Sequence, residues 1–131
     1  MTVQFSTAVR NARLEAVETT IGTSPTLEIR SGAPPANCAA ADTGSVLATL
    51  ALPSDWSANA ANASKTLLGL WQDLSADAGG TPGHFRIKQG ATCHMQGTAG
   101  TSGTDLILDA ATLTAAQQFS ITAFTMNEGN G

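Results

Sequence analysis

The chain is poor in the side chains on which most enzymes and many binding proteins depend. Its 131 residues include no tyrosine, two histidines and two cysteines, and only 12% are charged. A soluble domain typically carries about 25% charged residues, so small and uncharged polar side chains must cover much of this surface. Such a surface suits permanent contact with other proteins better than it suits a solitary cytosolic enzyme.

Positive charge is also scarce. Six Lys and Arg residues stand against ten Asp and Glu residues, which gives a net charge of −4. These few scattered cations cannot form the basic stripe that neutralises nucleic-acid phosphates, so we expect no nucleic acid as a partner. The sequence contains no run of about 20 apolar residues to span a membrane, and no basic-then-apolar signal peptide opens it. We therefore expect synthesis in the cytoplasm and no membrane partner.

The two cysteines, Cys38 and Cys93, lie far apart in the sequence. A disulfide framework uses more cysteines than two, which favours a pair of buried free thiols. The alternative is a single disulfide that forms late, after release into an oxidising medium.

Residues 6–21 carry the pattern of an amphipathic helix. Apolar side chains recur at spacings of three and four residues, at Leu14, Val17 and Ile21. Ser6 or Thr7 can cap the start, and Gly22 can end the helix in a left-handed conformation. We expect the apolar stripe to pack on the chain's own body; docking in a groove of a neighbouring subunit is the alternative.

Beyond Pro25 the apolar residues alternate, which predicts short strands separated by turns. The expected strands lie at residues 26–30, 46–52, 65–74 and 84–90, around Cys93 and Met95, around Leu106 and Leu108, and at 119–126. The segment 97–103 is expected to be a turn. The fold class is therefore mainly β: an antiparallel β-sandwich or jelly roll with one N-terminal α-helix. Residues 1–22 form the arm and helix of this single domain, and residues 23–131 form its β body.

The histidines and cysteines do not match a catalytic or metal-binding pattern. Adjacent residues on a strand point to opposite faces, so Cys93 and His94 should not meet as a nucleophile and a base. We expect an inward thiol and an outward imidazole at these two positions. A zinc site would add Cys38 and His84 to them, but the usual ligand spacing is missing. We therefore expect no catalytic residue, no cofactor and no metal site.

The two tryptophans differ in their sequence surroundings. Trp71 lies in an expected strand with core spacing, so we expect it in the core. Trp56 follows Pro53 and precedes a small polar loop. Two roles are open for Trp56: an exposed anchor, such as a stacking platform for a glycan, or a cap over the end of the sandwich.

Five runs of the sequence follow one another in a characteristic order. They are RNARLEAVETTIGTSPTLEIRSGAPP (10–35), ATLALPSDW (48–56), GHFRI (83–87), TCHMQGTAGTSGTDLILD (92–109) and FSITAFTMNEGNG (119–131). In this order they resemble a group of small virion proteins of tailed bacteriophages, which open with an RNA-x-L-(D/E)-A-(I/V) helix followed by TIGTS and a strand ending near SGAPP. The resemblance covers nearly the whole chain. This chain departs from the group in its NEGNG ending and in the loop at 57–69.

The resemblance implies a structural role in the virion. The expected function is that of a capsid decoration (cement) protein, which binds and stabilises the lattice of the major capsid protein. The alternative is a tail, neck or fibre-associated virion protein, including a glycan-binding module that uses Trp56. We expect no enzyme and a small homo-oligomer, a dimer or trimer, made in the bacterial host cytoplasm and located in the virion. Candidate interface residues are Phe5, Arg10, Arg13 and Trp56, with residues 2–5 as an arm anchored by Phe5.

Overall fold

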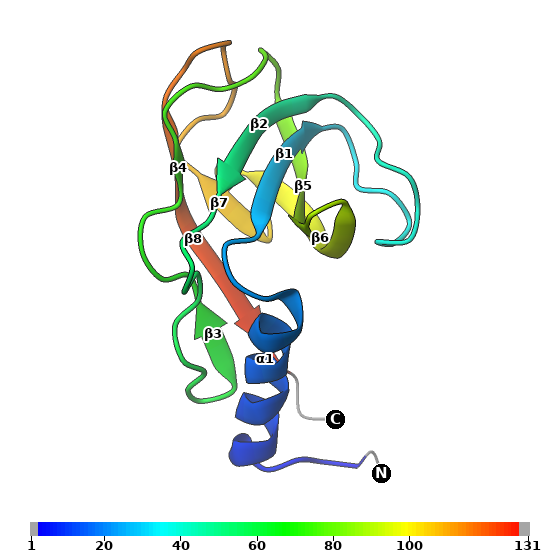
Figure 1. The fold of residues 1–131 in the computed structure, drawn as a ribbon, viewed down its shortest axis with the longest axis vertical. Coiled ribbons are helices and arrows are strands. Elements are labelled where there is room, and N and C mark those ends of the chain that lie inside the picture. Colours follow the sequence, from blue (N-terminus) through cyan, green and yellow to red (C-terminus); the bar gives the residue numbers. More distant parts are fainter. Residues whose placement is uncertain (1–2, 129–131) are drawn as a thin grey trace.

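One helix and eight strands make up the fold of residues 3–128, the part of the chain that the computed structural model describes (Figure 1). Helix α1 spans Thr7–Ile21. The strands are β1 (Thr26–Ser31), β2 (Val46–Ala51), β3 (Ser64–Thr66), β4 (Gln72–Asp73), β5 (Pro82–Gln89), β6 (Thr92–Gly100), β7 (Leu106–Leu108) and β8 (Phe119–Asn127). The helix lies at one end of the β body, beside β3 (Figure 1). Thr2 of the expected arm and residues 129–131 of the NEGNG ending lie outside the described residues.

Helix α1 begins and ends where its local sequence predicts. The Ser6 hydroxyl accepts a hydrogen bond from the Val9 N–H at 3.2 Å, which caps the first turn. The helix ends at Gly22, whose φ of 92° is a backbone conformation that glycine adopts without strain. Leu14 and Ile21 are buried. The expectation that the apolar stripe packs on the chain's own body is therefore confirmed for these two side chains.

The strands form one curled sheet. Its order is β2-β1-β5-β6-β7-β8-β3, and β4 also pairs with β8. The β6–β7 pair is parallel, and the other strand pairs within the described residues are antiparallel. The curl brings edge strand β2 to the segment that follows β4, where the N–H groups of Asp77 and Ala78 donate to the Leu47 carbonyl at 2.8 and 3.2 Å. The result is a half-barrel.

The prediction of a mainly β body with one N-terminal helix is confirmed. The antiparallel sandwich or jelly roll is not confirmed, because the described strands belong to one mixed sheet. The difference arises at residues 101–105, where the chain turns and returns beside Ala99 and Gly100 in a parallel direction. Asp105 holds this turn, since its carboxylate accepts bonds from the N–H and the hydroxyl of Thr98 at 2.9 and 3.1 Å.

Two predicted strand boundaries are wrong. The single strand expected at 65–74 is two short strands, β3 and β4, because Gly69 takes a φ of 79° between them. Residues 97–100, expected in a turn, continue strand β6. Gly97 serves close packing there, since a Cβ at this position would lie 2.8 Å from the Phe85 ring.

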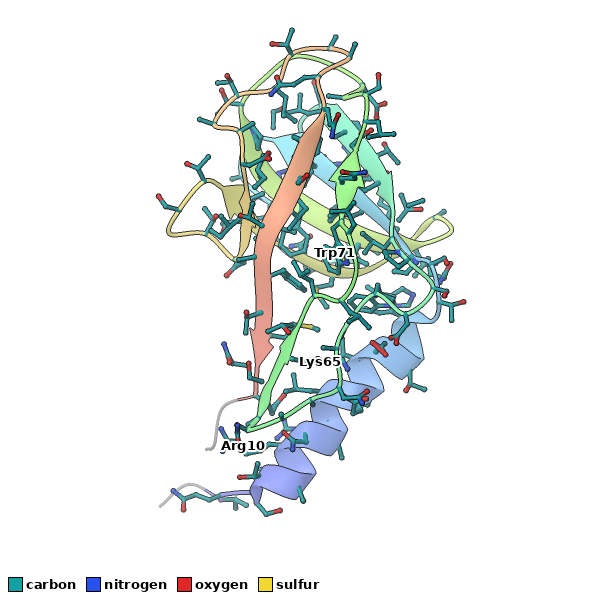
Figure 2. The ribbon with its side chains drawn as sticks, turned by 90° about the vertical axis from the view of Figure 1, so that its left-hand side faces the viewer. Arg10, Lys65 and Trp71 are labelled. Atoms are coloured by element: carbon teal, nitrogen blue, oxygen red, sulfur yellow. A yellow bond between two sulfur atoms is a disulfide. The ribbon has the colours of Figure 1, made fainter. Side chains whose placement is uncertain are left out.

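Aromatic side chains fill much of the space inside the curled sheet. The Trp71 ring centroid lies 6.1 Å from that of Trp56 and 5.5 Å from that of Phe124. Phe124 in turn meets Phe85 edge-on at 5.6 Å. Figure 2 shows Trp71 in the middle of the β body, well away from the free end of the helix. The expectation that Trp71 belongs to the core is confirmed.

Candidate interaction surface and the contacts that support it

A cluster around the fully buried Lys65 of β3 holds the helix to the body (Figure 2). The Lys65 Nζ donates to Glu15 Oε1 and to the Ala58 carbonyl, both at 2.7 Å, and Glu18 Oε2 lies 3.6 Å away. Glu15 also accepts the Ala60 N–H at 2.6 Å. The hydrogen bond from Lys65 lowers the pKa of Glu15. A buried ammonium needs such partners; we call Lys65, Glu15 and Glu18 the helix clasp.

Three of the four candidate interface residues lie together near the start of α1. The Arg13 guanidinium lies 5.2 Å from the centroid of the Phe5 ring and pairs with the Glu128 carboxylate at 2.8 Å. Arg10 Nε donates to the Glu128 carbonyl at 2.9 Å. Arg10 therefore fastens the end of the described chain to the helix, whereas Phe5 is exposed at the surface.

Trp56, the fourth candidate, is not at the surface. Its side chain is fully buried, and its Nε1 donates to the Gly22 carbonyl at 3.0 Å. Stacking on a glycan needs an exposed ring face, so of the two roles left open for Trp56 the exposed anchor is excluded. The observed contact instead joins the C-terminal end of α1 to the core, which is a capping role.

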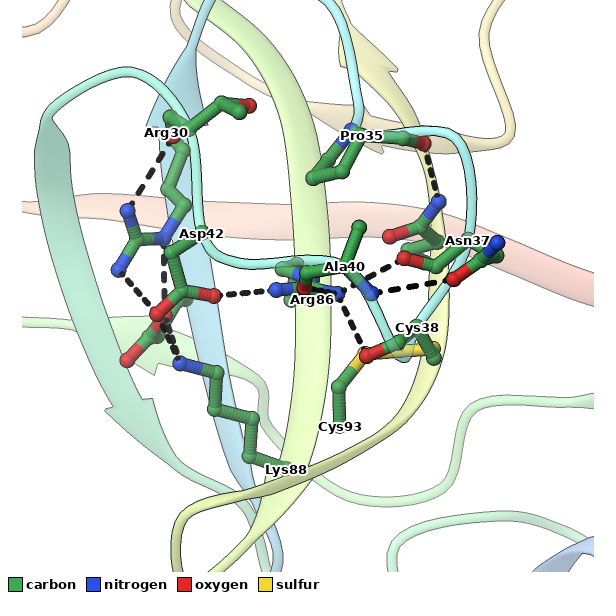
Figure 3. A network of polar contacts seen from close by, with 12 residues as sticks. Arg30, Pro35, Asn37, Cys38, Ala40, Asp42, Arg86, Lys88 and Cys93 are labelled. Atoms are coloured by element: carbon green, nitrogen blue, oxygen red, sulfur yellow. Dashed lines mark hydrogen bonds and ion pairs between the residues drawn. A yellow bond between two sulfur atoms is a disulfide. The ribbon is translucent and has the colours of Figure 1, made fainter.

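A second ion cluster lies under the loop of residues 32–45, which we call the covering loop (Figure 3). Asp42 of the covering loop forms an ion pair with Arg86. Asp42 also pairs with Lys88 at 2.7 Å and with Arg30 at 3.2 Å. Arg86 donates in addition to three carbonyls of the loop at 3.0 to 3.2 Å. We call Arg30, Arg86 and Lys88, which come from β1 and β5, the cationic face.

A disulfide joins the covering loop to strand β6. Cys38 of the loop and Cys93 of the strand are bonded, and their Cα atoms are 5.3 Å apart, within the usual range for a disulfide. The prediction of two free thiols is wrong, and the single disulfide kept as the alternative is present. Their separation of 55 residues hid this pairing, because only the path of the covering loop brings the two sulfur atoms together.

The two histidines have different surroundings. His84 is fully buried, and its Nδ1 lies 2.9 Å from the Gly32 carbonyl oxygen. His94 is exposed on β6, as expected. The disulfide occupies both sulfur atoms of the zinc set considered from the sequence. Within residues 3–128, no group of three or more His, Cys, Asp and Glu side chains is placed to hold a metal ion.

The covering loop should loosen in acid. Hydrogen bonds from Lys88 and Arg86 lower the pKa of Asp42 from 3.8 to about 2. A carboxylate with a depressed pKa stabilises the folded state above its unfolded-state pKa, and this stabilisation is lost as the pH falls through the folded-state pKa. We therefore expect amide hydrogen exchange in the covering loop to accelerate relative to exchange in β5 as the pH falls from about 4 to about 2. The rates are compared after correction for the intrinsic pH dependence of exchange.

Asp42→Asn is the matched variant for this acid response. It should show the faster loop exchange already at neutral pH and should lack the step between about pH 4 and pH 2. Wild-type protection of the covering loop in this variant would contradict the role given to Asp42.

Three exposed leucines lie in residues 68–74, a segment that begins after β3 and ends just after β4; we call it the leucine segment. Leu68 is 41% exposed, Leu70 64% and Leu74 65%. The sequence pattern does not predict this surface, because Leu68, Leu70 and Trp71 are expected in one strand and that expectation assigns no faces to them. Leu70 and Trp71 are adjacent and lie beyond the break at Gly69, so they point to opposite sides of the chain, and a buried Trp71 turns Leu70 outward. That alternation was the available signal.

Comparison of the chain with models of protein families, with curated proteins and with solved structures finds no match. Within residues 3–128, no helix is both long and apolar enough to cross a membrane.

Proposed function

We propose that this protein is a structural protein of a bacteriophage virion that decorates the capsid. In this proposal it binds the lattice of the major capsid protein through the leucine segment. The ordered runs that resemble small virion proteins support the class of protein. The leucine segment supports the kind of contact, because its three exposed leucines offer apolar surface that a protein partner can bury.

The observation that carries the proposal is that hydrogen bonds from the buried core hold the backbone next to the exposed leucines in place. The Leu68 N–H donates to the Trp56 carbonyl at 3.0 Å, and Trp71 Nε1 donates to the Leu68 carbonyl at 3.2 Å. Both indole side chains are buried, so Leu70 lies between two anchored residues. A surface that is already ordered loses little conformational entropy when a partner covers it. Full burial of one leucine contributes about 1.5–3 kcal/mol, an effect repeated at every copy on a capsid.

The pairing of the positively charged side chains within the chain also supports an apolar contact with the partner. Each of the six Lys and Arg side chains is bonded within the chain: Arg10, Arg13, Arg30, Lys65, Arg86 and Lys88. These contacts hold the helix and the covering loop to the body. Apolar contact at the leucine segment is therefore the better-supported mode of binding than ionic contact. We also propose a dimer or trimer as the decorating unit, since closed symmetry suits repeated capsid sites.

Replacement of Leu70 and Leu74 together by serine should weaken binding to capsids that lack this protein by roughly tenfold or more. Both side chains are more than half exposed, so the variant should fold as the wild type does. Val9→Ser is the matched control, because it removes an exposed apolar side chain from α1, and it should bind normally. Cosedimentation with purified capsids measures both variants.

Two outcomes would contradict the proposed contact. Normal binding by the double serine variant would exclude the leucine segment, and loss of binding in Val9→Ser alone would place the contact at the helix. Recovery of the protein with purified tails and not with heads would favour the tail, neck or fibre-associated alternative.

A further inference from the structure

The covering loop closes over the cationic face with little apolar support. Of residues 32–45, only Pro35 is buried. Burial of apolar surface is the main source of folding stability, so a segment with so little of it can open while the core remains packed. Polar contacts from the cationic face, from His84 and from Gln96 therefore hold this loop closed, together with the disulfide.

Closure of the loop also leaves polar atoms without partners. His84 Nε2, Arg86 Nε and Gln96 Oε1 are buried and have no hydrogen-bond partner among the described residues. Arg86 and Gln96 lie opposite each other in the β5–β6 ladder, and His84 precedes Arg86 by two residues on β5. All three also contact carbonyls of the covering loop through their other polar atoms. Opening of the loop would let water reach the unpaired atoms, which favours the open state.

We propose that the Cys38–Cys93 disulfide is a redox latch on this loop. With the disulfide formed, the covering loop stays closed over Arg86 and Lys88. With the disulfide reduced, the loop opens and uncovers the cationic face, while the helix clasp and the core stay intact. The bond joins the middle of the loop to β6, so it restrains the loop where few apolar contacts do.

The latch works by thiol–disulfide exchange. A small-molecule disulfide accepts two electrons from the sulfur atoms of Cys38 and Cys93. Its own S–S bond breaks, the Cys38–Cys93 bond forms, and the two cysteine protons pass to the two small thiols that are released. A dithiol reverses the reaction and is itself oxidised. The covering loop should therefore be open in the reducing cytoplasm and closed after release into an oxidising medium. Only this order of events rests on the proposed function.

The two lysines of the chain provide matched probes. Both are buried and ion-paired, but Lys88 lies under the covering loop and Lys65 lies in the helix clasp. Acylation by an amine-reactive ester, located by peptide mass spectrometry, reports the exposure of each. In the C38S/C93S variant, Lys88 should react roughly tenfold faster than in the disulfide-bonded wild type, and Lys65 at an unchanged rate.

Wild-type protein that is reduced with a dithiol and desalted under anaerobic conditions should behave as the serine variant does. It provides the same comparison if that variant does not fold. Equal acceleration at Lys65 would make the disulfide a staple of the whole fold, and no acceleration at Lys88 would mean that the loop stays closed without it. Either result overturns the proposal. Reoxidation with a small-molecule disulfide should restore slow acylation of Lys88, and failure to do so contradicts a reversible latch.

Discussion

Trp71→Ala should lower the free energy of unfolding by about 3–5 kcal/mol. The side chain is buried between the rings of Trp56 and Phe124, so its removal loses apolar contact and leaves a cavity. Its Nε1 also donates to the carbonyls of Trp56 and Leu68, at 3.1 and 3.2 Å. Because a domain of this size is stable by only about 5–15 kcal/mol, this variant should be close to unfolding.

Urea unfolding followed by circular dichroism measures this effect. Leu74→Ala is the control: it truncates an exposed side chain three residues away, and its free energy of unfolding should stay within about 0.5 kcal/mol of wild type. A cost below about 1 kcal/mol for Trp71→Ala would show that this ring is not central to the core.

Glu15→Ala should lower the free energy of unfolding by about 3 kcal/mol, because it leaves the Lys65 ammonium buried with only Glu18 and the Ala58 carbonyl nearby. Lys65→Met should cost less, since it removes the buried charge and leaves two carboxylates that solvent reaches in part. The double variant Glu15→Ala/Lys65→Met should therefore be more stable than Glu15→Ala alone.

A double-mutant cycle from urea unfolding measures the coupling between Glu15 and Lys65. The helix clasp predicts a clear interaction energy between the two positions, together with faster proteolysis of α1 in Glu15→Ala. Additive costs would mean that the ion pair does not hold the helix to the body, whatever the size of each single effect.

The helix was predictable from the sequence because its signals are local. Ser6 and Gly22 mark its two ends, and the spacing of Leu14 and Ile21 identifies its buried side. Alternation likewise identified most strands. The parallel β6–β7 pair was not predictable, because it depends on how Asp105 turns the chain back toward Thr98 rather than on any period within a strand.

The ion clusters were not predictable as pairs, because their members are distant in the sequence. Lys65 and Glu15 are 50 residues apart, and Lys88 and Asp42 are 46 apart. One signal was present in strand β5, where His84, Arg86 and Lys88 alternate with Phe85 and Ile87. A strand with one apolar face and one strongly polar face indicates that something polar covers the second face. It does not identify the covering loop.

Electron cryo-microscopy of the purified virion tests the proposed function most directly. We expect density for the half-barrel and its helix on the outer surface of the capsid, repeated with the lattice, with the leucine segment against the major capsid protein. Density for this fold only in the tail, neck or fibres, with none on the capsid, would contradict the proposed function.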